Sequence, residues 1–158
     1  MKENIDTEKI INKYSDIIYK IALGYLRNTT DAEDIVQEVL IKYISNKKPF
    51  KNEEHEKSWI IRVTLNMCFN EKHCARNRKS ILIDNVDKIK WFKTENSYII
   101  DLIDSLNNKY KSVFELFYIH DFSTKEISKI MKISEVAVRT RLKRARNSIK
   151  EKLKEGEN

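Results

Sequence analysis

The sequence predicts an all-α protein of two small helical domains joined by a flexible linker, and three observations support this prediction. The chain of 158 residues contains one Pro and two Gly, a composition that favours helices over turn-rich sheets. Apolar residues recur at intervals of three and four along most of its length, which is the spacing of one helix face. This periodicity fails over residues 80–96. We therefore predict domains at 1–79 and 97–154, with the linker between them.

Two amphipathic helices open the chain. Residues 8–26 and 31–45 each carry an apolar face that predicts burial in a shared core. Thr30 and Glu33 have the spacing of a capping box, so we expect them to define the start of the second helix. The outer surface of this helix is acidic and consists of Asp31, Glu33, Asp34, Gln37 and Glu38. Acidic residues also interact favourably with a helix N-terminus, so a purely structural role for this cluster stays open.

A third helix is predicted over residues 58–77, after an irregular and charged connection at 47–57. Its apolar residues include Trp59, for which we expect a core position rather than a base-stacking one. The polar residues of this helix are Arg62, Asn66, Asn70, His73, Arg76 and Asn77. Residues 72–79 contain two Lys and two Arg and no acidic residue, so a basic patch ends the first domain.

The predicted linker contains more apolar residues than flexible linkers usually do. Ile81-Leu82-Ile83 and Trp91-Phe92 stand among charged and polar residues, and we expect them to dock on a partner or between the domains. Two further helices are predicted at 97–106 and 109–120, and we expect their apolar residues to form the surface on which the last part of the chain packs.

The last part of the chain has the pattern of a helix-turn-helix. Ser123 and Glu126 form a capping box before a short apolar helix, and Ser134 can cap a second helix after a tight turn. The second helix has a buried stripe at Val138, Leu142, Ala145 and Ile149. Its outward residues are Arg139, Thr140, Lys143, Arg144 and Asn147.

The excess positive charge of the chain is concentrated in this segment. Residues 132–154 hold nine basic and two acidic residues, a net charge of +7, which equals the net charge of the whole chain. A helix-turn-helix whose second helix carries this charge indicates binding in the DNA major groove. The alternative interpretation is a solvated basic helix on an ordinary bundle.

Several classes of function lack their motifs. Two Gly cannot provide a glycine-rich phosphate loop, and His55, His73 and His120 have no catalytic Ser, Cys or paired-acid context. Cys68 and Cys74 lack the spacing of a zinc site or a disulfide framework. We therefore predict no enzymatic activity, no cofactor and no metal site. No apolar stretch approaches the ~18 residues that span a bilayer, so we expect a cytoplasmic protein that is not itself in the membrane.

The helix-turn-helix resembles a known family. It is similar to DNA-binding domain 4 of bacterial sigma-70 factors, in particular the extracytoplasmic-function branch. The residues that carry this similarity are Ser123-x3-Ile127-x5-Ile133-Ser-Glu-x2-Val138-Arg-x-Arg-Leu-x-Arg-Ala-Arg146. The resemblance implies that this domain reads the −35 promoter element. The implied DNA contacts are Arg139, Thr140, Lys143, Arg144, Arg146 and Asn147. The family commonly has Gly and Thr where this chain has Val136 and Ala137, so the contact made by that Thr is not carried over.

The first domain resembles sigma domain 2. The helix in sigma domain 2 that docks on the β′ clamp of core RNA polymerase is similar to the segment Asp31-Ala-Glu-Asp-Ile-Val-Gln-Glu-Val39. This resemblance implies polymerase contacts from Asp31, Asp34, Gln37 and Glu38. Trp59-Ile-Ile-Arg62-x3-Asn66 is similar to the helix that reads the −10 element. The implied −10 contacts are Arg62, Asn66, Asn70, Arg76 and Arg78.

These resemblances imply a sigma factor that binds core RNA polymerase and promoter DNA. They also imply an anti-sigma partner, which in this family is often membrane-bound. One alternative is an autonomous helix-turn-helix regulator that binds operator DNA without polymerase. Another is an RNA- or membrane-surface adaptor, which the confinement of charge to one helix-turn-helix argues against.

Overall fold

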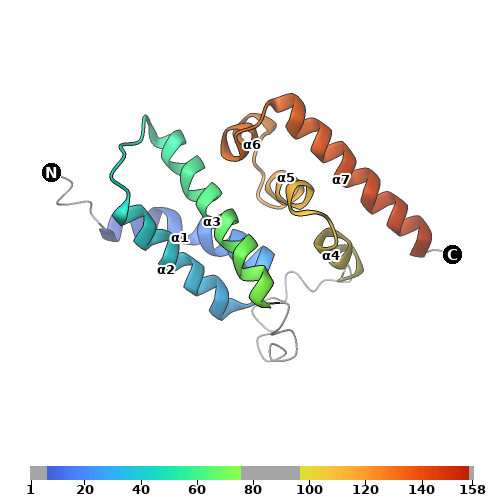
Figure 1. Ribbon diagram of the computed structural model, residues 1–158, viewed down its shortest axis with the longest axis horizontal. Helices are drawn as coiled ribbons and strands as arrows, with labels where there is room; N and C mark the ends of the chain where they lie inside the picture. Colours follow the sequence, from blue (N-terminus) through green and yellow to red (C-terminus); the bar gives the residue numbers. More distant parts are fainter. Residues whose placement is uncertain (1–6, 76–96, 157–158) are drawn as a thin grey trace. The chain divides into compact units, whose positions relative to one another are not determined.

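The computed structural model describes residues 7–75 and 97–156, and all regular structure in these residues is helical (Figure 1). The helices are α1 (Thr7–Leu26), α2 (Thr29–Ser45), α3 (Glu53–Ala75), α4 (Ser97–Asp104), α5 (Asn108–Tyr118), α6 (Thr124–Met131) and α7 (Glu135–Gly156). They divide into two compact units, α1–α3 and α4–α7. The prediction of an all-α fold with two helical domains is confirmed, and the segment predicted as the linker lies outside the described residues.

The first unit is a bundle in which α1 packs against both α2 and α3. Its core contains the buried side chains Tyr14, Ile18, Ile21, Ile35, Val39, Ile60 and Leu65. These residues keep the three- and four-residue spacing of helix faces that drive packing. The predicted role of the first two helices in a shared core is therefore confirmed.

The start of α2 differs from the prediction. Asn28, rather than Thr30, caps the helix, because its side-chain oxygen accepts a hydrogen bond from Asp31 N at 3.1 Å. Asn is as good an N-cap as Ser or Thr, so the motif alone did not decide between the two positions. The helix consequently begins at Thr29, and Asp31 falls in its buried first turn.

The start of α3 also differs from the prediction. The helix begins at Glu53 instead of Ser58, and the irregular connection is shortened to residues 46–52. The Asn52 side chain accepts a hydrogen bond from His55 N at 2.8 Å, which is the role of an N-cap. The charged run that suggested a loop is thus the acidic first turn of a helix, where carboxylates are favourable.

The second unit places α4, α5 and α6 against α7. The capping box of α6 is present: Glu126 N donates to Ser123 Oγ and Ser123 N donates to Glu126 Oε1, each at 3.1 Å. The turn follows with Lys132 in the left-handed conformation, at φ 56° and ψ 46°. Ser134 Oγ then accepts a hydrogen bond from Ala137 N at 3.1 Å. The predicted helix-turn-helix is confirmed, as is the buried stripe of α7 at Val138, Leu142, Ala145 and Ile149.

A buried cluster of charged side chains supports α5. The side chain of Lys111 is fully buried, and its ammonium nitrogen lies 2.9 Å from Asp104 Oδ1 and 3.9 Å from Glu115 Oε1. Asn107 caps this helix by accepting a hydrogen bond from Lys109 N at 3.3 Å. The cluster joins α4 to α5. It was not predicted from the sequence, because a Lys is expected to be exposed to solvent.

Candidate nucleic-acid interface

The exposed face of α7 is the strongest candidate for nucleic-acid binding. Its members are Val136, Arg139, Thr140, Lys143 and Asn147, and all five are exposed. Their spacing of three, four, seven and eleven residues from Val136 places them on one side of the helix, opposite the buried stripe. We call this set the α7 face.

Two arginines flank the α7 face. At 3.6 residues per turn, Arg144 and Arg146 lie about 80° to either side of the direction of Val136. Arg146 Nη1 donates a hydrogen bond to Tyr118 Oη of α5 at 3.0 Å. On the other flank, the hydrogen bond from Arg144 lowers the pKa of Tyr110, and the charge of Lys109 adds to the effect. Tyr118 of α5 therefore orients the guanidinium group of Arg146, and Tyr110 of α5 lies beside Arg144.

The tyrosine on the Arg146 side is itself supported. The ring centroid of Tyr118 lies 4.7 Å from that of Phe114 and 4.9 Å from that of Phe117. Sequence reasoning assigned the two arginines to DNA but missed the tyrosines, because Tyr118 and Arg146 are 28 residues apart. A half-exposed aromatic cluster near the end of α5 was the available signal.

Arg139 is held loosely on the α7 face. Its Nη1 lies 3.5 Å from Glu135 Oε2 one turn earlier, and both side chains are largely exposed. Exposed pairs of this kind contribute ~0.2–1 kcal/mol, so a DNA phosphate or base edge can displace the carboxylate at low cost.

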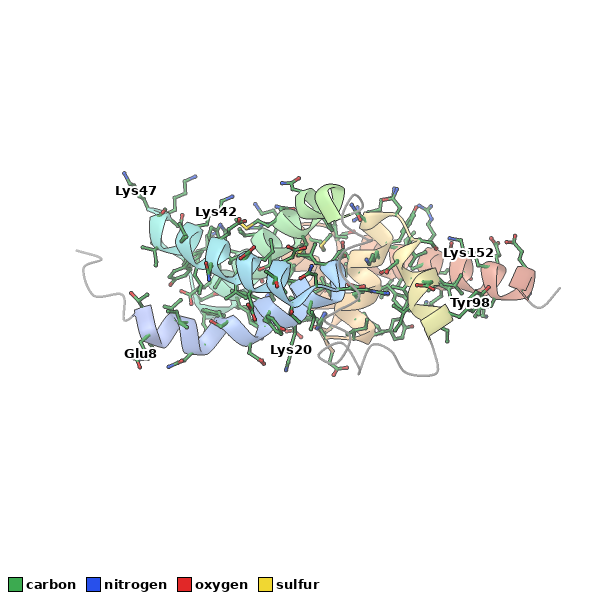
Figure 2. The ribbon with its side chains drawn as sticks, turned by 90° about the horizontal axis from the view of Figure 1, so that it is seen from below. Glu8, Lys20, Lys42, Lys47, Tyr98 and Lys152 are labelled. Carbon is green, nitrogen blue, oxygen red and sulfur yellow. The ribbon has the colours of Figure 1, made fainter. Side chains whose placement is uncertain are left out.

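Near its C-terminal end, away from the α7 face, α7 contacts α4 and the turn that follows it. Lys152 Nζ donates to Ser105 Oγ at 2.5 Å, and Tyr98 of α4 lies where a side chain at Gly156 would be. Figure 2 shows Lys152 and Tyr98 near this end of α7. The C-terminal half of α7 is thus fixed by α4 and the apolar cluster around Leu102 and Ile103.

The acidic surface of α2 is smaller than predicted. Asp34, Gln37 and Glu38 are exposed as expected, on adjacent turns of one helix face. The expectation that Asp31 is exposed is wrong, because the residue is only 7% exposed. The earlier helix start brings Asp31 into the first turn of α2, beside the buried cap Asn28.

The predicted −10 residues on α3 are partly described. Asn66 and Asn70 are exposed and lie one turn apart, in register with Arg62. Arg62 is half-buried, and this burial lowers the pKa of its guanidinium. Arg76 and Arg78 lie outside the described residues.

An aromatic cluster holds the connection before α3. The ring of Phe50 stacks on that of Tyr43, with 5.8 Å between the ring centroids. It contacts the ring of Trp59 edge-on, with 5.5 Å between the centroids. Lys51 N also donates to His55 Nδ1 at 3.1 Å. Trp59 is half-buried and packs its ring against Tyr43, so it lies at the edge of the core and not within it as predicted. The exposed lysines of the connection are Lys47, Lys48 and Lys51, and Figure 2 shows Lys47 and Lys42 extending away from the ribbon.

A carboxylate with two tyrosine donors joins the three helices of the first unit. Glu56 accepts hydrogen bonds from Tyr14 Oη at 2.5 Å and from Tyr43 Oη at 3.0 Å. Burial and the bond to Glu56 raise the pKa of Tyr14, and raise the pKa of Tyr43 to about 12. The network fixes the first turn of α3, and with it the residues that follow.

The described residues also bear on metal binding, membrane insertion and grooves. Within 7–75 and 97–156 there is no group of three or more His, Cys, Asp or Glu side chains arranged to hold a metal ion. None of the helices in these ranges combines the length and apolarity needed to cross a membrane. An open groove of about 620 Å³ between α1 and α2 is lined by residues of mixed character, among them Tyr19 and Glu33.

Comparison with known families gives two matches along the chain. Residues 10–79 match Sigma-70 region 2, and residues 97–149 match Sigma-70, region 4. The first match covers most of α1 and all of α2 and α3, and the second covers α4, α5, α6 and most of α7.

Individual proteins agree with these matches. The RNA polymerase sigma factor SigV of Bacillus subtilis (strain 168) is 28% identical over 85% of this chain and 83% of its own length. The ECF RNA polymerase sigma factor SigW of the same organism is 27% identical over 92% of this chain and 88% of its own.

Two solved structures share the fold. The sigma factor RpoE of Bartonella quintana, in complex with the anti-sigma factor NepR, has a TM-score of 0.67 at 19% identity, over 94% of this chain and 97% of its own. CnrH, in complex with the cytosolic domain of CnrY, has a TM-score of 0.62 at 18% identity, over 94% of this chain and 87% of its own.

Proposed function

Because the chain belongs to the extracytoplasmic-function branch of the sigma-70 family, we propose that it binds core RNA polymerase and directs promoter-specific initiation. The observation that carries this proposal is the α7 face. It is a polar and basic helix surface, presented by a capped helix-turn-helix and flanked by Arg144 and by Arg146, which Tyr118 anchors. In this geometry a recognition helix enters the major groove of duplex DNA.

On α7, base reading and phosphate binding are divided between two sets of residues. Arg139, Thr140, Lys143 and Asn147 lie on the α7 face and would contact base edges of the −35 element. Arg144 and Arg146 stand at its flanks, where the two phosphate backbones border a groove. The hydrogen bond from Arg146 to Tyr118 orients that guanidinium group before DNA arrives, which reduces the entropy lost on binding.

In the first unit, α3 and the connection before it would hold the −10 element. Single-stranded DNA requires a cationic track for the backbone, with polar or aromatic groups for exposed bases. Lys47, Lys48 and Lys51 supply exposed charge beside the aromatic cluster, while Arg62, Asn66 and Asn70 supply polar groups along α3. By the family resemblance, Arg76 and Arg78 would extend this track.

The polymerase-binding surface would consist of Asp34, Gln37 and Glu38 on α2. Three exposed polar side chains on adjacent turns suit a charged interface with basic residues of the β′ clamp. Asp31 does not belong to this surface because it is buried.

We further propose an anti-sigma partner. Two structural neighbours were solved with partner proteins, one with the anti-sigma factor NepR and the other with the cytosolic domain of CnrY. A partner of this class would cover the polymerase- or DNA-binding surfaces in the cytoplasm, and in this family it is often membrane-bound.

Transcription in vitro tests the proposal directly. Purified core RNA polymerase is incubated with a pool of promoter fragments, with and without this protein. Initiation that depends on the protein, at fragments sharing one −35 and −10 pair, is the expected result. Failure to initiate, together with tight binding of the protein alone to a palindromic duplex, would instead support an autonomous regulator.

A further inference from the structure

One apolar side chain stands on the otherwise polar α7 face. Val136 is the second residue of α7 and is 63% exposed. Its neighbours on this face are Arg139 and Thr140, one turn further along the helix. A Val in this place contributes nothing to the buried stripe, and it is a weaker helix former than Ala or Lys.

The position of Val136 is fixed before any partner binds. Ser134 caps the helix by accepting a hydrogen bond from Ala137 N at 3.1 Å, so the backbone on both sides of Val136 is held. The side chain is β-branched and has few accessible rotamers. A small, rigid apolar surface is therefore presented at the N-terminal end of the helix, with little entropy to lose on contact.

We propose that Val136 reads the methyl group of a thymine in the −35 element. This inference rests on the proposed function, which brings the N-terminal end of α7 to base edges in the major groove. Of the four bases, only thymine presents an apolar group there, its C5 methyl, and Val136 can neither donate nor accept a hydrogen bond. Thr140, whose side chain carries a methyl group, lies on the same face one turn away.

The contact uses a residue at which the chain departs from the common family pattern. It gives Val136 a role in selecting the promoter, whereas Arg144 and Arg146 at the flanks would bind any duplex. Loss of the methyl contact should therefore change which sequence is preferred and leave the salt dependence of binding unchanged.

The test uses the full chain bound to core RNA polymerase and the promoter found by the transcription assay. Each −35 thymine is replaced in turn by deoxyuridine, which removes the methyl group and keeps the base pair. Affinity is measured by competition for the native protein, for Val136→Ala and for Ile99→Ala. The last variant shortens an exposed aliphatic side chain on α4 and serves as the matched control.

The expected result is one thymine position at which deoxyuridine lowers affinity about fourfold for the native protein and for Ile99→Ala, the effect of one methyl group leaving an apolar contact. Val136→Ala should show little loss at the same position. Equal losses in all three proteins, or no position with a loss, would overturn the inference while leaving the proposed function intact. If no fragment is initiated, the proposed function fails and the inference fails with it.

Discussion

The two units compensate their partly or fully buried carboxylates in different ways. In the first, Glu56 is held by the neutral hydroxyl groups of Tyr14 and Tyr43. In the second, the carboxylates of Asp104 and Glu115 face the buried ammonium of Lys111. Loss of one tyrosine donor leaves another in place, whereas loss of the ammonium leaves negative charges without compensation. The second unit should therefore be much more sensitive to a single truncation at its polar centre.

The largest effect is expected for Lys111→Met. The substitution keeps most of the buried hydrocarbon and removes the charge, so it should lower the free energy of unfolding of the second unit by about 3–5 kcal/mol. Hydrogen exchange of α5 and α7 amides measures this loss separately from the first unit.

Lys109→Met is the matched control, because Lys109 is exposed and lies two residues before Lys111 in the sequence. It should change stability by less than about 0.5 kcal/mol. Adding Asp104→Asn and Glu115→Gln to Lys111→Met should restore part of the loss. Equal stability of the Lys111 and Lys109 variants would contradict the charge-balance explanation.

A smaller effect is expected in the first unit for Tyr43→Phe. The ring and its stacking on Phe50 are kept, while one hydrogen bond to a carboxylate is removed, so the loss should be about 1.5–3 kcal/mol. Urea unfolding followed by circular dichroism measures it. Tyr19→Phe, at a half-buried tyrosine of α1 outside this network, should cost less.

The same network predicts a dependence on alkaline pH. The pKa of Tyr43 is raised from 10.0 to about 12, so the folded protein keeps a proton that the unfolded chain releases. The stabilisation is complete below pH ~10 and is lost as the pH rises toward 12. Unfolding measured between these values should show a steeper loss of stability for the native protein than for Tyr43→Phe. Parallel curves would show that Tyr43 does not contribute.

The two exposed surfaces should separate in function. Arg139→Ala should reduce discrimination between −35 sequences by about 1–3 kcal/mol and leave polymerase affinity unchanged. Asp34→Asn with Glu38→Gln should weaken polymerase binding several-fold, because exposed pairs contribute ~0.2–1 kcal/mol each, and should leave −35 selectivity unchanged.

Competition between promoters and titration of labelled core polymerase distinguish the two losses. Both variants change exposed residues, so their thermal unfolding should match that of the native protein. If each variant lost both functions together, the assignment of one surface to each partner would be wrong.

The smallest effect is expected at the turn of the helix-turn-helix. Lys132 adopts a left-handed conformation that Gly adopts without steric cost, so Lys132→Gly should stabilise the second unit by about 1 kcal/mol. Lys129→Gly, inside α6, should destabilise it by a similar amount. A loss of stability in both variants would show that the Lys132 side chain makes a larger contribution than its backbone strain costs.

The sequence predicted the helix-turn-helix accurately because its signals are local. Ser123, Glu126 and Ser134 cap their helices as the pattern indicated. Local signals failed where two residues could serve as the cap, as with Asn28 and Thr30. They also failed where a run of acids before Ser58 fitted both an exposed loop and a first helical turn.

Contacts between distant residues could not be predicted in this way. The pattern rules place charged residues outward, so they exclude Lys111 from the core, although Asp104 supplies the compensating charge from another helix. The bond between Arg146 and Tyr118 likewise depends on how α7 packs on α5. Residue types thus indicated the candidate DNA surface, but only the packing shows which arginines are anchored.

The aromatic cluster before α3 gives the protein an intrinsic optical reporter. The Trp59 ring contacts Phe50 of the connection at a centroid distance of 5.5 Å, and the chain has only one other tryptophan, Trp91. A nucleotide base that enters beside Phe50 would change the polarity around the indole and shift its emission. With Trp91→Phe as background, stopped-flow fluorescence of the protein mixed with single-stranded −10 DNA would follow the entry of a base beside Trp59 in real time.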